Sequence, residues 1–392
     1  MAKIIGIDLG TTTSLVSYLK NGKPEIIPNK FGKRLTDSVV GIDKYGNIIV
    51  GEEAKRILNG TKIEEIKRSM GSNKVVKLGD KEYSPEEVSA EILKKLKEEA
   101  EDFLGEEVDE AVITVPAMFN SIQKAATIRA GELAGLKVER IISEPTAAAM
   151  AYGIDNMEKY QKIIVYDFGG GTFDVSILEL DDGILDVIAT SGDNYLGGKD
   201  IDEILIKNIP VKIEDDVEKI KLKLEVEEAK KRLSTLMGTD IIVPELNIDY
   251  ELKREKFEEL VSPLVNKTVD FIDKALSSAK LKREDIDVVL LVGGTTRIPL
   301  VQETLKNIFG SKVKKFGDPQ EAVALGAGVQ AGIKSSEISS EDGLIITDIC
   351  NYSLGVASIG EYQGIIMPDT FSVIIPKNSN LPCTKSDTYC TA

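Results

Sequence analysis

One short motif occurs twice in the sequence, and this repeat constrains the fold more than any other feature. Asp8-Leu9-Gly10-Thr11-Thr12-Thr13 follows an apolar run that begins at Ile4, and Asp167-Phe168-Gly169-Gly170-Gly171-Thr172 follows a similar run from Ile163. The aspartate, the first glycine and the last threonine are each offset by 159 residues, and a second apolar run follows each copy. Two distant copies of one strand–turn–strand unit predict a duplicated domain whose halves face each other across a cleft.

The rest of the sequence is typical of an α/β protein, because apolar β-branched runs alternate with amphipathic stretches. The clearest predicted strands are 4–7, 108–115, 163–166 and 288–292. Ser84-Pro85-Glu86-Glu87 is a capping box with proline in the first turn, and Gly105 ends the pattern, so we predict a helix between them. Further helices are predicted over about 120–136, 217–234 and 254–280.

The composition excludes several classes of chemistry. The chain has no histidine, which rules out Ser-His-Asp and Cys-His nucleophiles and imidazole metal sites. Its formal net charge is −16, and without a basic patch this argues against nucleic acid or an anionic membrane as a partner. No run approaches the ~20 apolar residues of a bilayer span, and we expect a cytoplasmic protein.

The three cysteines all lie near the end of the sequence, at Cys350, Cys383 and Cys390. Their spacing fits neither a spread disulfide framework nor paired zinc knuckles. We expect reduced thiols, with a Cys383–Cys390 bridge as the alternative.

Each glycine-rich turn predicts a phosphate site. Consecutive backbone N–H groups can face one anion there, and the threonines add hydroxyl donors. Asp8 and Asp167 would repel a polyphosphate unless Mg²⁺ stood between them, so the turns indicate a metal nucleotide. A single turn would be better explained by an ordinary hairpin, but the repeat reverses this and favours the nucleotide. The sequence contains neither a Walker loop nor a Rossmann fingerprint.

Together with a third glycine turn, Val292-Gly-Gly-Thr-Thr-Arg-Ile-Pro299, the two motifs resemble the actin-like ATPase superfamily, and specifically the 70-kDa heat-shock chaperones of the DnaK type. Four further signatures follow in the family's order: Val115-Pro116-Ala117, Ser143-Glu144-Pro145-Thr146-Ala147-Ala148-Ala149, Gly192-Asp193 with Leu196-Gly197-Gly198, and Asp318-Pro319 with Glu321-Ala322-Val323-Ala324. The resemblance implies a duplicated actin-like, ribonuclease H-like ATPase fold, with two α/β lobes around a nucleotide cleft and a partial β-sandwich after them.

The resemblance also implies a division into domains. Residues 1–341 would form the nucleotide-binding domain, with lobe I over about 1–160 and 322–341 and lobe II over about 161–321. Residues 342–348 would be an interdomain linker, and 349–392 an incomplete N-terminal part of a substrate-binding β-sandwich. Ile359 would then cover a bound peptide.

The family's phosphate and metal residues carry over position by position. The implied catalytic residues are Asp8, Thr13, Lys67, Glu144, Asp167 and Thr172. The residues around the phosphates would be Gly10, Thr11, Thr12, Thr13, Gly169, Gly170, Gly171, Thr172, Gly197 and Gly198. Mg²⁺ would be held mostly through water by Asp8, Glu144, Asp167 and Asp174, and K⁺ would share several of these groups. Without the resemblance, Lys67 would be interpreted as a solvated helix lysine.

The nucleoside of ATP or ADP would lie between one helix and the third glycine turn. The helix supplies Glu227, Lys230, Lys231 and Ser234, whose spacing places them on one helical face. The turn supplies Gly293, Gly294, Thr295 and Arg297. Lys231 stands where the family usually has arginine, and Gln320 where aspartate is common.

The implied activity is ATP hydrolysis that controls the binding of unfolded polypeptide clients, together with a J-domain co-chaperone and a nucleotide exchange factor. Lobe closure would pass through Pro116 and Lys124, the latter an arginine in most relatives, to the linker. Thr347 replaces a linker leucine, which predicts weaker docking, and Asn351-Tyr352 replaces the usual Pro-Leu. The alternatives within the superfamily are a small-molecule kinase and a filament-forming protein.

Overall fold

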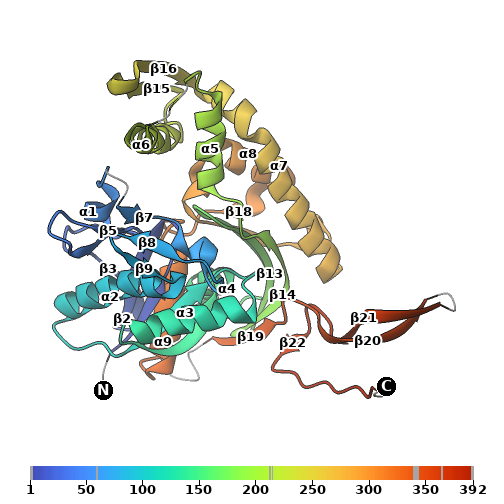
Figure 1. Cartoon of the computed structure of the whole chain (residues 1–392). Coiled ribbons are helices and arrows are strands. Elements are labelled where there is room, and N and C mark those ends of the chain that lie inside the picture. Colours follow the sequence, from blue (N-terminus) through green and yellow to red (C-terminus); the bar gives the residue numbers. More distant parts are fainter. Residues whose placement is uncertain are drawn as a thin grey trace.

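The computed structural model describes residues 3–58, 61–211, 213, 215–338, 344–362 and 365–389. Two α/β lobes lie side by side, and a long hairpin extends away from them (Figure 1). Each lobe is built on one large mixed sheet.

The lobe I sheet has the order β11-β10-β1-β2-β3, with β4 paired to β2. Their bounds are β1 Ile4–Asp8, β2 Thr13–Lys20, β3 Lys23–Ile27, β4 Thr36–Asp37, β10 Glu110–Val115 and β11 Lys137–Ser143. Ile5 and Ile7 pack in a core with α2 (Pro85–Leu104) and α3 (Ser121–Leu133). Ile4 packs on the opposite side, in the core that contains α4 (Glu144–Gly153) and α9 (Ala322–Lys334).

The lobe II sheet has the order β18-β17-β12-β13-β14-β19-β22. Their bounds are β12 Gln161–Phe168, β13 Phe173–Asp181, β14 Ile184–Asp193, β17 Val288–Val292, β18 Val313–Lys314, β19 Ile345–Ile349 and β22 Asn380–Leu381. One face packs against residues of α5 (Gly198–Asn208), α6 (Asp216–Arg232), α7 (Arg254–Ala279) and α8 (Pro299–Phe309). Ile163 and Val165 of β12 face the other way, into the core shared with α4 and α9.

The central strands of the two sheets have the same topology. β1 is parallel to β10 and antiparallel to β2, and β12 is parallel to β17 and antiparallel to β13. The outer strands repeat the pattern, with β11 and β18 parallel and β3 and β14 antiparallel to their neighbours. The repeated motif therefore occupies the same turn in both sheets.

Smaller elements complete the lobes. In lobe I these are β5 Val40–Ile42, β6 Ile48–Val50, α1 Glu52–Lys55, β7 Lys62–Ile63, η1 Ile66–Ser69, β8 Val76–Leu78 and β9 Lys81–Tyr83. In lobe II they are β15 Gly238–Val243, η2 Pro244–Leu246, β16 Ile248–Lys253, η3 Arg283–Asp285, η4 Gly294–Arg297 and η5 Gly310–Lys312. In Figure 1, α6 and the β15–β16 hairpin lie at the top of the molecule, above the small strands of lobe I.

The predicted helices are present, and local chemistry sets their ends. The Ser84 hydroxyl accepts a hydrogen bond from the Glu87 amide at 3.2 Å and the Glu87 carboxylate accepts one from the Ser84 amide at 2.8 Å, as the capping box predicts. Gly105 then ends α2 with φ 70°. The helix predicted over about 120–136 is too long, because α3 ends at Leu133 and Gly135 follows with φ 75°.

Close packing of α4 against α9 depends on a glycine. A Cβ added at Gly326 would lie 1.7 Å from the Ala147 carbonyl oxygen. That oxygen belongs to helix backbone and cannot move by changing a rotamer. The helices therefore approach closely only because this position has no side chain.

We expect Gly326→Ala to lower the free energy of unfolding by about 1–3 kcal/mol or more, because the overpacking outweighs the ~1 kcal/mol by which alanine favours a helix. Denaturant unfolding followed by circular dichroism measures this. Gly238→Ala is the control, since the nearest atom to its added Cβ is 3.8 Å away. Equal stability of the two variants would refute the packing argument.

The predicted linker is described from Leu344 onward, and it forms an additional strand of lobe II. β19 pairs in parallel with β14, with Thr347 opposite Asp186, and Leu344 and Ile349 are buried. The Thr347 hydroxyl donates a hydrogen bond to the Asp186 carboxylate. The hydroxyl therefore has a partner in the linker groove, and the weaker docking predicted from the loss of the leucine stays a prediction.

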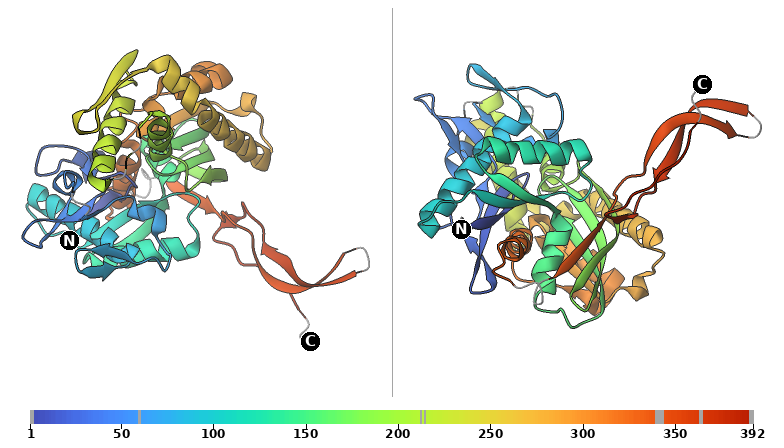
Figure 2. Two further views of the ribbon diagram at one scale, coloured as in Figure 1. Left: turned by 45° about the horizontal axis from the view of Figure 1, so that its top comes forward. Right: turned by 90° about the horizontal axis from the view of Figure 1, so that it is seen from below.

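Beyond the linker, β20 (Leu354–Tyr362) and β21 (Ile365–Ile375) form an antiparallel hairpin. This hairpin projects away from both lobes in both views of Figure 2. Cys350 and Cys383 are free thiols, and Cys390 lies outside the described residues. Within the described ranges, no helix has both the length and the apolar character that crossing a bilayer requires.

Candidate nucleotide and cation site

A cavity of about 540 Å³ lies between the lobes where the repeated turns meet. It is lined by nearly all of the predicted site residues: Asp8, Gly10, Thr11, Thr12, Thr13, Lys67, Glu144, Asp167, Gly169, Gly170, Thr172, Gly198, Glu227, Lys230, Lys231, Ser234, Gly293, Gly294, Thr295 and Arg297. The structure therefore brings together residues that are up to 289 positions apart in the sequence (Asp8 and Arg297).

Three predicted residues do not line this cavity: Gly171, Gly197 and Asp174. Gly171 turns its carbonyl toward Arg68, which donates to it through Nε at 3.0 Å and Nη2 at 2.8 Å. Gly197 lies behind the turn, where an added Cβ would approach the Gly170 backbone to 2.5 Å. These two glycines support the turn and do not line the cavity, and their contact with phosphate stays a prediction.

The two phosphate turns touch each other across the cleft. A Cβ at Gly170 would lie 1.9 Å from the Thr12 hydroxyl oxygen, and one at Gly171 would lie 2.4 Å from the Thr11 Cγ2 methyl. The lobe II turn is closed by the Gly169 amide, which donates to the Thr172 carbonyl at 3.1 Å. The glycines are therefore needed for contact between lobes as well as for the shape of the turn.

The acidic residues of the site lie in a buried cluster. Burial, followed by the charge of Glu144, raises the pKa of Asp8 to about 7 and that of Asp174 to about 8. The pKa of Asp167 is raised well above its usual value by burial and by Glu144, Asp174 and Asp8. Lys67 is 5% exposed and donates a hydrogen bond to Glu144, which is also buried. One buried lysine thus faces four acidic residues.

This cluster fits a hydrated cation. Asp174 is buried opposite Asp167 on the neighbouring strand, and neither of its carboxylate oxygens has a hydrogen-bond partner in the described part of the chain. An uncompensated buried carboxylate is costly, and a cation would relieve the cost. Across the described ranges, no three acidic or cysteine side chains form a direct metal cage. Contact mostly through water, as Mg²⁺ prefers, suits this arrangement.

The raised pKa values predict how stability depends on pH. Between about pH 4 and 8 the folded protein binds more protons at these aspartates than the unfolded chain does, so the free energy of unfolding falls as pH rises, by about 1.4 kcal/mol per pH unit for each such group. MgADP should stabilise the protein more at pH 8 than at pH 5. Thermal unfolding at both pH values tests this, with Asp174→Asn expected to flatten the dependence; an unchanged slope in that variant would contradict the assignment.

The predicted nucleoside residues surround the outer part of the cavity. Lys230 is partly buried and donates to the Gly198 carbonyl at 2.8 Å, while its Nζ lies 2.7 Å from Asp202. The Arg297 guanidinium contacts both oxygens of Asp318, at 2.6 and 2.7 Å. Ser234 lines the cavity but lies beyond the end of α6 at Arg232, so the predicted single helical face is only partly correct.

Cationic residues that the sequence did not single out also contribute to the cavity or join the lobes. Lys33, Lys55 and Lys199 line the cavity. Arg68 follows Lys67 on η1 and reaches lobe II, where it contacts Gly171 and the Asp200 carboxylate, the latter at 2.7 Å. Its position beside Lys67 was the only signal available in the sequence.

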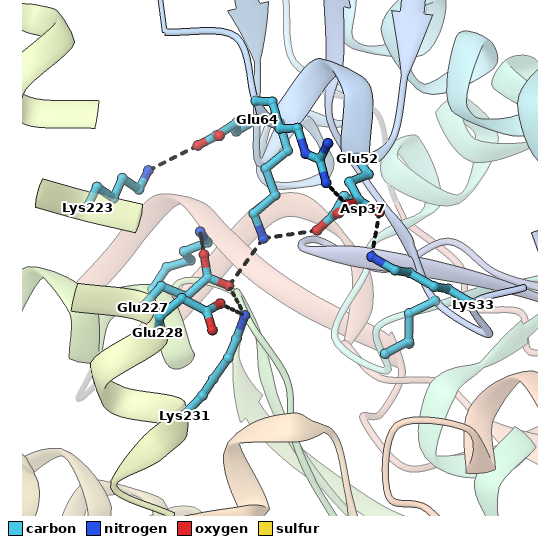
Figure 3. Close-up of polar contacts among 12 residues, drawn as sticks. Lys33, Asp37, Glu52, Glu64, Lys223, Glu227, Glu228 and Lys231 are labelled. Carbon is cyan, nitrogen blue, oxygen red and sulfur yellow. Dashed lines mark hydrogen bonds and ion pairs between the residues drawn. The ribbon is translucent and has the colours of Figure 1, made fainter. Parts of the chain in front are cut away.

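Ion pairs join the lobes at the mouth of the cleft. Glu227 of α6 is surrounded by three lysines: Lys231 at 3.0 Å, Lys55 of lobe I at 3.5 Å and Lys199 at 3.7 Å. Burial by itself raises the pKa of Glu227, but the lysine charges together hold it well below the usual range. Figure 3 shows Glu227 on α6 facing Asp37 of lobe I.

A second connection lies farther out along α6. Lys223 contacts Glu64 at 3.3 Å and Glu65 at 3.2 Å, and the pair with Glu64 is visible in Figure 3. Glu65 has φ 58° and directly precedes η1, the 3₁₀ turn that carries Lys67 and Arg68. The closed arrangement of the lobes therefore also fixes the segment that holds Lys67.

The geometry defines a class of protein: two duplicated α/β lobes with a cleft at their junction that is lined by the repeated glycine-rich turns. Comparisons with known proteins agree with it. The family described as Hsp70 protein matches residues 4–392. Chaperone protein DnaK of Thermosipho melanesiensis is 47% identical over 411 residues, which cover 99% of this chain and 68% of the relative. Those of Thermosipho africanus and Thermotoga neapolitana are each 46% identical over 411 residues, covering 99% of this chain and 67% and 68% of the relatives.

The chain belongs to the Hsp70 family. It is an ATP-driven chaperone protein of the DnaK type, it has the actin-like ATPase fold, and its enzymatic activity is the hydrolysis of ATP. The predictions of family, fold class and activity are confirmed, and the kinase and filament alternatives are not favoured.

Proposed function

We propose that the cavity between the two phosphate turns is where ATP is bound and hydrolysed, with the roles predicted for the individual residues. One observation carries the proposal: the two turns touch across the cleft, and Lys67, Glu144 and the buried aspartates meet beside them. A nucleotide whose phosphates enter this junction would contact both lobes at once, which explains how binding holds the lobes closed.

The residues of the chain would act mainly by position and charge. The Lys67 ammonium would stabilise the negative charge that develops on the transferred phosphoryl group. Glu144, which accepts a hydrogen bond from Lys67, would orient the attacking water. Amides and hydroxyls of the two turns, including Thr13 and Thr172, would hold the phosphates. Bound Mg²⁺ would neutralise phosphate charge, held mostly through water by Asp8, Asp167 and Glu144.

We assign K⁺ to the same acidic cluster, with Asp174 as its most buried contributor. The support is that the two Asp174 carboxylate oxygens lack partners among the described residues. Replacing K⁺ by Na⁺ should slow hydrolysis if the cluster selects the larger ion.

The predicted division into domains is also part of the proposal. β19 extends the lobe II sheet, which suits a linker that docks on the nucleotide-binding domain, and the β20–β21 hairpin suits the start of a substrate-binding sandwich. Unfolded polypeptide is the proposed client. A J-domain co-chaperone and a nucleotide exchange factor remain predictions from the family resemblance, and a cytoplasmic location remains a prediction from the charge and the apolar pattern of the sequence.

Calorimetric titration tests the proposed site. MgADP should bind with one-to-one stoichiometry, and Asp167→Asn should weaken this binding at least tenfold, because the variant removes a charge that faces the metal. Asp181→Asn, at the exposed end of the neighbouring strand β13, is the matched control and should bind normally. Equal weakening in both variants, or none in either, would refute the assignment of the cavity.

A further inference from the structure

We propose that Asn351 and Tyr352 are positioning residues for ATP hydrolysis. They connect the segment that follows β19 to the turn formed by residues 116–119, and through this turn they hold the Asp8 side of the phosphate site. The inference rests on the proposed location of the ATP site. It concerns two residues that replace the Pro-Leu expected at these positions.

The side chain of Asn351 is buried, with 7% of the residue exposed, and both ends of its amide have partners. Its Nδ2 donates a hydrogen bond to the Ala117 carbonyl, and its Oδ1 accepts one from the Thr190 hydroxyl at 3.0 Å. Asn351 therefore bridges the 116–119 turn of lobe I and strand β14 of lobe II. A proline at this position could make neither side-chain hydrogen bond.

Tyr352 adds a second contact with the same turn. Its hydroxyl donates a hydrogen bond to the Met118 carbonyl. The Asn194 side chain, just after β14, donates to the same carbonyl at 3.4 Å. The Ala117 carbonyl is thus held from the segment after the linker, and the Met118 carbonyl is held both from that segment and from lobe II.

The turn is directly connected to the phosphate site. It follows β10, whose last residues include Thr114, and the buried Thr114 hydroxyl donates to the Asp8 carboxylate at 3.3 Å. The turn is closed by the Phe119 amide, which donates to the Pro116 carbonyl at 3.1 Å. A displaced turn would therefore move Thr114, the residue that donates to Asp8.

The contacts of Asn351 and Tyr352 with the 116–119 turn require β19 to be paired with β14. Asn351 lies two residues beyond β19, and its partner Thr190 lies on β14, the strand to which β19 is paired from Ile345 to Thr347. If β19 left β14, the buried amide of Asn351 would lose its partners, which is costly for a desolvated polar group. The Asn351–Tyr352 contacts therefore couple the position of the linker strand to the position of the turn.

Two variants of the full chain test the inference. Tyr352→Phe removes one hydroxyl, and Asn351→Ala removes the side-chain amide. We expect each to slow single-turnover ATP hydrolysis about three- to tenfold, the rate equivalent of one hydrogen bond, while the Kd for MgATP changes less than twofold. Tyr389→Phe is the control, because its hydroxyl bonds to Ser372 and Asp387, within the segment beyond the linker. Thr190→Val combined with Asn351→Ala should be no slower than Asn351→Ala alone.

A merely structural role would give a different pattern. In that case the variants would lower thermal stability and change the hydrolysis rate and the Kd for MgATP together, or Tyr352→Phe would leave both the rate and the Kd unchanged. Either result would overturn the inference. The unmodified chain measured alongside separates the two proposals. Failure of that chain to hydrolyse ATP would refute the proposed site, whereas normal hydrolysis in the unmodified chain and in both variants would refute only the positioning role.

Discussion

Replacing Lys67 by alanine is expected to lower the single-turnover rate of ATP hydrolysis at least ~100-fold while the Kd for MgATP changes only severalfold. Lys67 is buried against Glu144, so its ammonium acts in a site with little screening by water. Its charge matters most where negative charge moves during phosphoryl transfer, and removing one such group typically costs two to three orders of magnitude in rate. Quenched-flow measurement of released phosphate and calorimetry of binding give the two quantities separately.

Lys74→Ala serves as the control for this prediction, since Lys74 is an exposed lysine close in sequence whose side chain donates to the Ser69 hydroxyl at 3.3 Å. It should hydrolyse ATP at the rate of the unmodified chain. If Lys67→Ala retained more than about a tenth of the rate, Lys67 would have no direct part in the transition state. A parallel loss of binding would instead indicate a collapsed site.

Gly170→Ala is expected to weaken nucleotide binding at least ~30-fold without unfolding either lobe. The added Cβ would lie 1.9 Å from the Thr12 hydroxyl oxygen on the opposing turn, so the two turns could no longer touch. Phosphates held by one turn alone would lose the donors of the other, each worth about 1 kcal/mol or more when charge-assisted. Titration of MgADP measures the loss.

The second variant needed for that prediction is Thr12→Gly in the Gly170→Ala chain, which removes the atoms that clash. This double variant should recover part of the affinity for MgADP. The control variant Gly238→Ala should bind MgADP as tightly as the unmodified chain. Recovery would show that contact between the turns sets the affinity. Unchanged binding in Gly170→Ala would mean that nucleotide binds with the lobes apart.

The sequence predicted the repeated elements best, and the reason is local. The two strand–turn–strand motifs, the capping box at Ser84 and the glycine after α2 are each specified by adjacent residues, so they could be recognised without a fold. The prediction that the two turns face each other followed from their equivalence. The close approach of Gly170 to Thr12 and of Gly171 to Thr11 confirms it.

What the sequence could not predict depends on contacts between distant segments. Arg68 reaches Gly171 and Asp200 only after the lobes have assembled, and Lys55 meets Glu227 in the same way. Lys67 was assigned by family resemblance. Its burial depends on a single turn of 3₁₀ helix, which no periodicity of apolar residues predicts. The pairing of β19 with β14 likewise joins residues about 160 apart in sequence, such as Asp186 and Thr347.

Single-turnover hydrolysis of MgATP by the unmodified chain tests the central claim most directly. With protein in excess, we predict that bound ATP is converted to ADP and free inorganic phosphate in one exponential phase, with water as the only acceptor and ADP still bound when phosphate is released. This result would agree with a cleft that positions ATP between two touching phosphate turns. Absence of released phosphate, or its recovery on another acceptor molecule, would contradict the account.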